Sequence, residues 1–183
     1  NDNDVSTTGV DTIIVGGGDD RVLAGLSNDE VTSVYGNDVV LGDNGELSYI
    51  NNVLVNATSS EASLGGADTL SLGEGNNIVI AGAGVDTITT TDGVDIILGD
   101  NGQLVWSVTG IIESVTATDL TNGADDIIIA GDADNIIVGA TGNDVIESGV
   151  NNDTILGDGG VALYNAGVLV SLSSDAAEAG DDL

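Results

Sequence analysis

An acidic or amide side chain returns about every nine residues in this chain, and the pattern restarts after 57 residues. The recurring residues are Asp11, Asp20, Asp29, Asp38, Asp68, Asn77, Asp86, Asp95, Asp125, Asp134, Asp144 and Asp153. A branched aliphatic residue, called U below, follows each by two positions: Ile13, Val22, Val31, Val40, Leu70, Val79, Ile88, Ile97, Ile127, Ile136, Ile146 and Ile155. Self-similarity at a fixed period is typical of stacked repeats, so this pattern constrains the fold more than any single motif.

Each block of 57 residues divides into four nine-residue units and an insertion. The units occupy residues 9–44, 66–101 and 123–159, and the insertions occupy residues 45–65, 102–122 and 160–179. Residues 1–8 are interpreted as the end of a preceding hairpin and residues 180–183 as the start of a fourth block. Block three needs one extra residue, which we assign to Thr141. Because there is no initiator methionine and the fourth block is cut at Leu183, we expect a window of a longer array.

Within the units, β-branched residues alternate around U, while glycine and aspartate fill the other positions. This composition predicts short strands separated by glycine-rich turns. A helix is disfavoured, because each glycine costs about 1 kcal/mol relative to alanine. Two units form one 18-residue coil. Coils stacked about 4.8 Å apart would place every U side chain in one narrow core. We therefore expect an all-β parallel β-roll, or β-solenoid, with two coils per block.

The insertions predict β-hairpins, because alternating apolar runs flank short turns that are polar or contain glycine. The turns are Asn51-Asn52, Thr109-Gly110 and Asn165-Ala166-Gly167. Each hairpin carries one aromatic residue at a matching place: Tyr49, Trp106 or Tyr164. We interpret these aromatic residues as apolar anchors that clamp the hairpins to the stack. Stacking against a ligand such as a sugar is the alternative.

The two outer faces of the expected stack differ in polarity. Units one and three expose mostly polar residues. Units two and four expose an apolar stripe made of Leu23, Val39, Leu41, Ile78, Ile80, Ile96, Leu98, Ile137 and Leu156. A stripe of this length is not left in water. We expect the hairpins, or a neighbouring molecule, to cover this second face.

The charge of the chain calls for a compensating cation. One arginine, no lysine, no histidine and 31 acidic residues give a net charge of −30. A compact anion of this kind repels itself. Disorder is the usual result of such a charge, but 41% hydrophobic residues argue against it. Because cysteine and histidine are both absent, only oxygen ligands remain, and these suit hard cations such as calcium.

The same composition excludes several functions. Phosphate contacts need lysine or arginine, and Arg21 alone cannot support nucleic-acid binding. No apolar run reaches the roughly 18 residues of a membrane span, and no signal peptide is visible. No Ser–His pair, Cys–His pair or histidine zinc ligand can be formed. We therefore expect that the chain is not an enzyme.

The units resemble the RTX family, whose nonapeptide G-G-x-G-x-D-x-U-x builds a calcium-loaded parallel β-roll. The best matches are the segments 16–22, GGGDDRV, and 81–88, AGAGVDTI. The resemblance covers nearly all of the chain outside the insertions. It implies a secreted or extracellular protein and several calcium ions, each held between stacked turns by aspartate side chains and main-chain carbonyl groups.

By that resemblance, calcium is held by pairs of recurring residues from neighbouring coils. The implied pairs are Asp11 with Asp29, Asp20 with Asp38, Asp68 with Asp86, Asn77 with Asp95, Asp125 with Asp144, and Asp134 with Asp153. Main-chain carbonyl ligands are expected near Gly16, Gly18, Gly25, Gly73, Gly75, Gly82, Gly84 and Gly142. Asn77 replaces a charged ligand with a neutral one, so we expect its site to be altered or empty.

A second acidic signature, built around Asp43, Asp100 and Asp158, closes the blocks. These residues either cap the last calcium of a block or make the turn into the hairpin, and both readings stay open. For the recurring aspartates themselves, the alternative is a ladder of turn-forming side chains without metal.

Three functions are compatible with these features. The first is a calcium-dependent structural segment of a large extracellular protein, such as a fibre, surface layer, biofilm matrix or adhesin stalk. In this hypothesis the segment folds after secretion and associates with itself end to end or laterally. The second is an accessory repeat module of a secreted enzyme. The third is an adhesin face that binds a surface glycan or ice.

Overall fold

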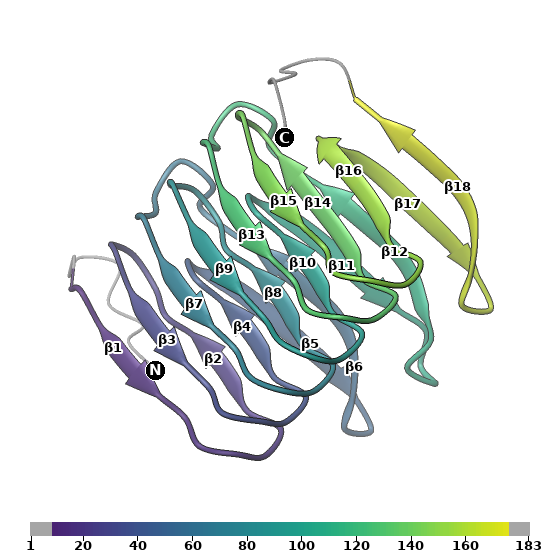
Figure 1. The fold of residues 1–183 in the computed structure, drawn as a ribbon, viewed down its shortest axis with the longest axis horizontal. Helices are drawn as coiled ribbons and strands as arrows, with labels where there is room; N and C mark the ends of the chain where they lie inside the picture. Colours follow the sequence, from purple (N-terminus) through teal and green to yellow (C-terminus); the bar gives the residue numbers. More distant parts are fainter. Residues whose placement is uncertain (1–8, 176–183) are drawn as a thin grey trace.

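The computed structural model describes residues 9–175, which form three six-stranded sheets (Figure 1). The residues interpreted as a preceding hairpin and as a fourth block lie outside this range. The first sheet contains β1 (Thr12–Ile14), β3 (Glu30–Thr32), β7 (Thr69–Ser71), β9 (Thr87–Thr89), β13 (Ile127–Ile129) and β15 (Val145–Glu147). The second contains β2 (Arg21–Leu23), β4 (Val39–Leu41), β8 (Ile78–Ile80), β10 (Ile96–Leu98), β14 (Ile136–Ala140) and β16 (Thr154–Asp158).

The first two sheets are parallel and confirm the β-roll. The chain alternates between them, so each coil adds one three- to five-residue strand to each sheet. Their register aligns U with U: Ile13 pairs with Val31, and Val40 pairs with Val79. The U side chains fill the space between the sheets, and Val31, Val40 and Ile88 have no solvent exposure. This narrow aliphatic core is the one that the nine-residue period predicts.

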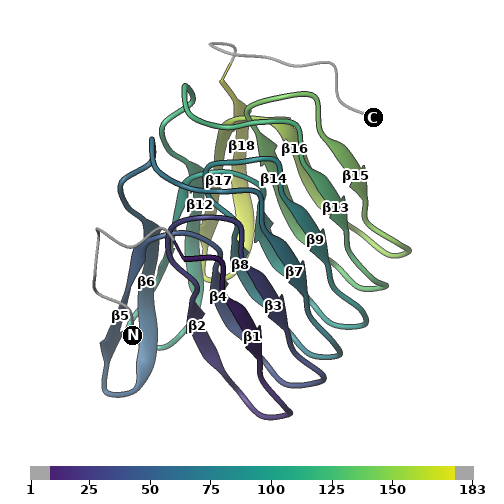
Figure 2. The same ribbon diagram turned by 90° about the vertical axis from the view of Figure 1, so that its left-hand side faces the viewer.

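The hairpins form a third, antiparallel sheet. It contains β5 (Gly45–Ile50), β6 (Val53–Ser59), β11 (Gly102–Trp106), β12 (Ile112–Ala117), β17 (Gly160–Asn165) and β18 (Val168–Ser174). Successive hairpins also pair with each other, through β6 with β11 and β12 with β17. Figure 2 shows the three sheets as parallel layers, with the second sheet in the middle.

Mutual pairing of the hairpins was not predicted, although the sequence contains the reason for it. A hairpin adds two strands to the third sheet, and the two coils of a block add two strands to the second sheet. Strands in both sheets are spaced about 4.8 Å apart. The two layers therefore advance by the same distance per block, and each hairpin reaches the next one without a gap.

The third sheet covers the second face of the stack, as predicted. Leu41, Leu98 and Leu156 of the second sheet pack in one core with Leu104 and Val115 of the hairpins. Every one of these five side chains is buried. Coverage weakens at the ends of the stack, where Leu23 is 44% exposed and every residue of β18 is exposed.

The three aromatic residues act as anchors to different degrees. Trp106 is 9% exposed and belongs to the core between the second and third sheets, and Tyr164 packs against that core. Tyr49 is more exposed and accepts a 2.8 Å hydrogen bond from Arg21 Nε. The Arg21 guanidinium also lies 5.2 Å from the centroid of the Tyr49 ring. The first hairpin is thus held to β2 by a polar contact and a cation–π contact.

The register of block three differs from the prediction by one residue in its first two units. Ile128 pairs with Ile88 and is fully buried, whereas Ile127 pairs with Thr87 and is 42% exposed. Likewise Ile137 is fully buried in the core between the first two sheets, and Ile136 packs toward the hairpins. The U residues are therefore Ile128 and Ile137, and Ile137 does not belong to the outer stripe.

The extra residue of block three lies at the tip of the second hairpin and not at Thr141. This hairpin occupies residues 102–117, one residue more than the first hairpin at 45–59. Its strands are joined by residues 107–111, in which Ser107 N–H donates to Ile111 O. A hairpin tip tolerates an added residue, whereas an addition within a coil would break the stacking. The nine-residue spacing is therefore uninterrupted inside block three.

We predict that Trp106→Ala destabilises the protein by about 3 kcal/mol, because it leaves a cavity between the second and third sheets. Limited proteolysis should then cut the hairpins faster, while urea unfolding gives the change in stability. Tyr35→Ala is the control, since Tyr35 is 60% exposed and lies outside the hairpins. Equal protease resistance of the two variants would show that Trp106 does not clamp the third sheet.

Candidate metal centre

The recurring residues stack into two ladders, one along each edge of the roll. Edge one comprises the turns that lead into strands of the first sheet. Its rungs are Asp11, Asp29, Asp68, Asp86, Asp126 and Asp144. The main-chain N–H of each rung donates to Oδ1 of the next rung. The bond from Asp29 N–H to Asp68 Oδ1 is 2.7 Å long, and that from Asp86 N–H to Asp126 Oδ1 is 2.8 Å long.

Edge two comprises the turns that lead into strands of the second sheet, at the lower ends of the first-sheet strands in Figure 1. Its rungs are Asp20, Asp38, Asn77, Asp95, Asn135 and Asp153. The same bond links them, for example from Asn77 N–H to Asp95 Oδ1 at 2.7 Å. Four of the six implied pairs are therefore stacked as expected, namely the pairs in blocks one and two.

Asp125 and Asp134 do not occupy the rungs predicted for them. They lie one residue earlier, in an exposed outer row. Asp125 Oδ1 accepts from Asn143 N–H at 2.8 Å, and Asp134 Oδ1 accepts from Asn152 N–H at 2.9 Å. Asp126 and Asn135 occupy the inner rungs instead and stack on Asp144 and Asp153. The sequence could not separate the two rows by residue type, because acidic or amide residues fill both. The uninterrupted nine-residue spacing from Asp126 to Asp153 was the available signal.

The turns need glycine because neighbouring coils approach closely. Gly84 has a φ of +145°, and a Cβ there would lie 2.0 Å from Gly66 O. The carbonyl groups predicted as ligands lie on both edges. Gly16, Gly18, Gly73 and Gly75 lie in turns of edge two, and Gly25, Gly82, Gly84 and Gly142 lie in turns of edge one.

Edge one carries buried oxygen atoms that have no partner within residues 9–175. They are the Oδ2 atoms of Asp29, Asp68, Asp86 and Asp126. A cradle lies beside two of them. A Cβ on Gly42 would be 2.4 Å from Asp68 Oδ2 and 2.5 Å from Ala81 O. A Cβ on Gly99 would be 2.4 Å from Asp126 Oδ2 and 2.7 Å from Gly139 O. A carboxylate and a carbonyl oxygen thus face one small space, which is the donor set that calcium prefers.

Asp43 and Asp100 supply further carboxylates where the chain leaves the roll for a hairpin. Asp43 is 3% exposed, and its Oδ2 accepts from Ala83 N–H in the next turn of edge one at 2.7 Å. Asp100 accepts from Thr141 N–H at 2.7 Å in the same way. Both side chains therefore face the roll interior, which favours the capping role over a simple hairpin turn. Asp158 ends β16, the outermost strand of the second sheet among the described residues, and its role stays a prediction.

Burial makes the charged form of these carboxylates unfavourable. It raises the pKa of Asp43 and of Asp68 to about 8, and the negative charges of Asp86 and Asp29 add to the effect. Burial also raises the pKa of Asp100 to about 8 and that of Asp126 to about 10, with further contributions from neighbouring aspartates. A row of buried carboxylates without cationic partners is stable when ionised only if a cation shares the site.

Across residues 9–175, no three acidic side chains converge in a geometry that would hold a metal by themselves. A cation at edge one would therefore draw part of its ligands from main-chain carbonyl groups, such as those of Ala81 and Gly139.

Within the same residues, no helix is long and apolar enough to cross a membrane.

Comparison with protein-family models gives a match to the RTX calcium-binding nonapeptide repeat (4 copies), over residues 5–33, 71–103 and 129–161. These segments make up about half of the chain. The chain belongs to the RTX calcium-binding nonapeptide repeat family. Its repeats bind several calcium ions, which supply the positive charge that the buried RTX aspartates lack. Searches of curated proteins and of solved structures found no match.

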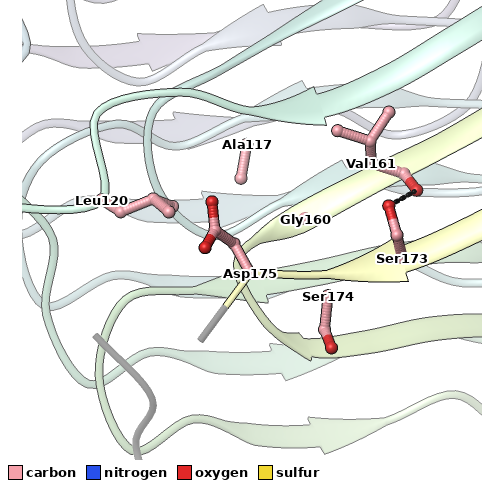
Figure 3. A pocket seen from close by; sticks show the side chains of 7 residues that line it. All are labelled: Ala117, Leu120, Gly160, Val161, Ser173, Ser174 and Asp175. Atoms are coloured by element: carbon pink, nitrogen blue, oxygen red, sulfur yellow. Dashed lines mark hydrogen bonds between the residues drawn. The ribbon is translucent and has the colours of Figure 1, made fainter. Parts of the chain in front are cut away.

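A pocket lies beside the last hairpin, lined by Ala117, Leu120, Gly160, Val161, Ser173, Ser174 and Asp175 (Figure 3). None of the rungs of the RTX ladders lines it. Asp175 is the one carboxylate among these described lining residues.

We predict that Asp126→Asn weakens calcium binding, while Asp125→Asn leaves it nearly unchanged. The two residues are adjacent and the substitutions are identical, but only Asp126 is a buried rung. Isothermal titration with calcium at pH 7.5 measures both affinities. Equal losses in the two variants would contradict the register described above.

We also predict that the calcium-free protein is more stable at pH 5 than at pH 8. Buried aspartates with raised pKa values hold protons in the folded state that the unfolded state releases above about pH 4. Stability therefore falls as the pH rises from about 4 to about 8. Far-UV circular dichroism of protein stripped of calcium gives the folded fraction at the two pH values, and urea unfolding gives the stability wherever that fraction is high. A calcium-free protein that is more stable at pH 8 would refute the assigned burial.

Proposed function

We propose that this chain is a calcium-dependent structural segment of a large extracellular protein, which folds on calcium binding after secretion. The observation that carries the proposal is the row of buried, unpartnered carboxylates on edge one. The chain cannot neutralise them itself, because Arg21 is its only basic side chain and is engaged by Tyr49. The folded state is therefore linked to an external cation.

This linkage makes calcium concentration the switch for folding. A ligand that binds only the folded state stabilises it in proportion to the logarithm of ligand concentration. Calcium sites assembled from stacked turns do not exist in the unfolded chain, so their binding energy is folding energy. Proteins with RTX repeats are typically secreted. Low calcium inside the cell would keep the chain unfolded for export, and higher calcium outside would fold it.

The three-layer architecture supports a structural role in a fibre, surface layer, biofilm matrix or adhesin stalk. Every block presents the same cross-section, and its two cores extend along the whole stack. The proposal includes end-to-end or lateral association, because an open strand edge favours pairing with another strand. It also assigns no catalytic role to the chain.

Two other candidates remain proposals with weaker support. An accessory module of a secreted enzyme would have the same calcium sites, and the neighbouring sequence of the parent protein would identify it. A glycan- or ice-binding face would need regular rows on the first sheet. The outward row there contains Thr69 and Thr87 but also Glu30 and Ile127, which does not form a regular threonine array.

Far-UV circular dichroism during a calcium titration tests the proposal. At pH 7.5 in excess EGTA we expect a random-coil spectrum, which converts cooperatively to a β spectrum as calcium is added. Magnesium at the same concentration is the control, because it demands a tighter octahedral geometry and retains its water. Sedimentation velocity on the same samples reports association.

A β spectrum that persists unchanged in excess EGTA would show that calcium does not drive folding. A calcium-folded protein that stays monomeric at all concentrations would remove self-association from the proposal.

A further inference from the structure

The two edges of the roll differ in the partners of the rung atom that does not take part in the ladder, which is Oδ2 of an aspartate or Nδ2 of an asparagine. On edge two, hydroxyl groups from the same turn reach two of the four carboxylates. Ser148 Oγ donates to Asp153 Oδ2 at 2.8 Å, and Ser33 Oγ donates to Asp38 Oδ2. In both turns the serine stands five residues before the rung. These carboxylates are hydrogen-bonded through both oxygens without a cation.

The amide rungs of edge two close the turn in another way. Asn77 Nδ2 donates to Gly73 O at 3.2 Å and to Gly75 O at 3.0 Å. Asn135 Nδ2 donates to Gly131 O at 3.0 Å and to Ser148 O at 3.2 Å. The amide group thus occupies carbonyl oxygens that a calcium ion would otherwise use, including two that the sequence predicted as ligands. It supplies hydrogen-bond donors where an aspartate would need a cation.

Asp95 is the one rung of edge two with a buried oxygen, Oδ2, that lacks a hydrogen bond within the described residues. Thr90 stands five residues before it, but Thr90 Oγ1 is also buried without a hydrogen-bond partner within residues 9–175, so Asp95 is the exception on this edge. The rungs above and below Asp95 are Asn77 and Asn135, which carry no charge.

On edge one, a hydroxyl-bearing residue also stands five positions before Asp68 and Asp126, namely Ser63 and Thr121. It does not reach the rung, because Asp68 Oδ2 and Asp126 Oδ2 have no hydrogen-bond partner within the described residues, and the Thr121 hydroxyl donates to Asp119 Oδ1. The residues five positions before Asp29, Asp86 and Asp144 are Ala24, Ala81 and Gly139, which carry no hydroxyl or amide side chain. All six rungs of edge one are aspartates, and Asp43 and Asp100 add two more buried carboxylates to the same edge. The Oδ2 atoms of four rungs are buried without partners.

We propose that this chain binds its calcium along edge one only, with Asp43 and Asp100 as additional ligands, while serine and asparagine side chains make the corresponding polar contacts on edge two. The inference rests on the calcium dependence proposed above. It assigns the two edges different roles: edge one takes the calcium, and the polar contacts of edge two form in the folded roll without a metal. The difference lies in which Oδ2 atoms receive a hydrogen bond from the protein.

Matched aspartate-to-asparagine variants test this assignment. Asp68→Asn alters edge one, and Asp95→Asn alters edge two. Each side chain is at most 2% exposed and carries an unpartnered Oδ2. Each substitution removes one negative charge. Isothermal titration and equilibrium dialysis with calcium give the number of bound ions. We expect Asp68→Asn to lose at least one ion and Asp95→Asn to keep the wild-type number.

Two further variants keep the test decisive if Asp68→Asn fails to fold. The double variant Asp38→Asn/Asp95→Asn should bind the full number of ions, because asparagine already occupies two rungs of that ladder. Asp43→Asn should lower the affinity or the number of ions. A loss of ions in the double variant, or an unchanged titration of Asp43→Asn, would overturn the proposal while leaving calcium-driven folding intact. A wild-type protein that binds no calcium would instead reject the proposed function itself.

Discussion

The bond from the main-chain N–H of one rung to the carboxylate of the next is the interaction on which the roll depends. It fixes the vertical register of the coils, and it brings the carboxylates of the inner coils into turns where they are buried from solvent. Stacking and burial are therefore coupled, so that the fold cannot gain the first without the electrostatic penalty of the second. The aliphatic core is thin, because three- to five-residue strands contribute one U side chain each. Whether the coils remain stacked therefore depends on whether the buried negative charge is neutralised.

The second core adds what the first cannot supply. A roll of two sheets would leave the leucine and isoleucine side chains of β4, β8 and β10 in water. The hairpin sheet buries them and links blocks through antiparallel pairing, so that contacts between blocks do not depend on the turns alone. One surface of the molecule is thus stabilised by apolar packing and the ladder edges by polar contacts, and the two contributions respond differently to calcium and to salt.

Much of this organisation could be predicted from the sequence, because its period is regular and its residue types are few. The coil length, the U core, the hairpins and their position over the second face follow from spacing and polarity alone. The register of block three did not, since runs such as Ile127-Ile128-Ile129 offer an aliphatic residue in either alignment. Pairing between hairpins and the closure of edge two by Ser33 and Asn77 were also missed. These depend on which side-chain atoms meet across a turn, and a repeat pattern does not encode that geometry by spacing.

The equal advance of hairpins and coils has a consequence for how such a molecule can change its length. Losing or duplicating a single coil would leave a hairpin strand with no layer beneath it and would interrupt the outer sheet. Whole blocks can be added or removed without this defect, and each one lengthens the stack by about 10 Å, which is two strand spacings. The length of a protein built this way can therefore change during evolution only in steps of one complete block.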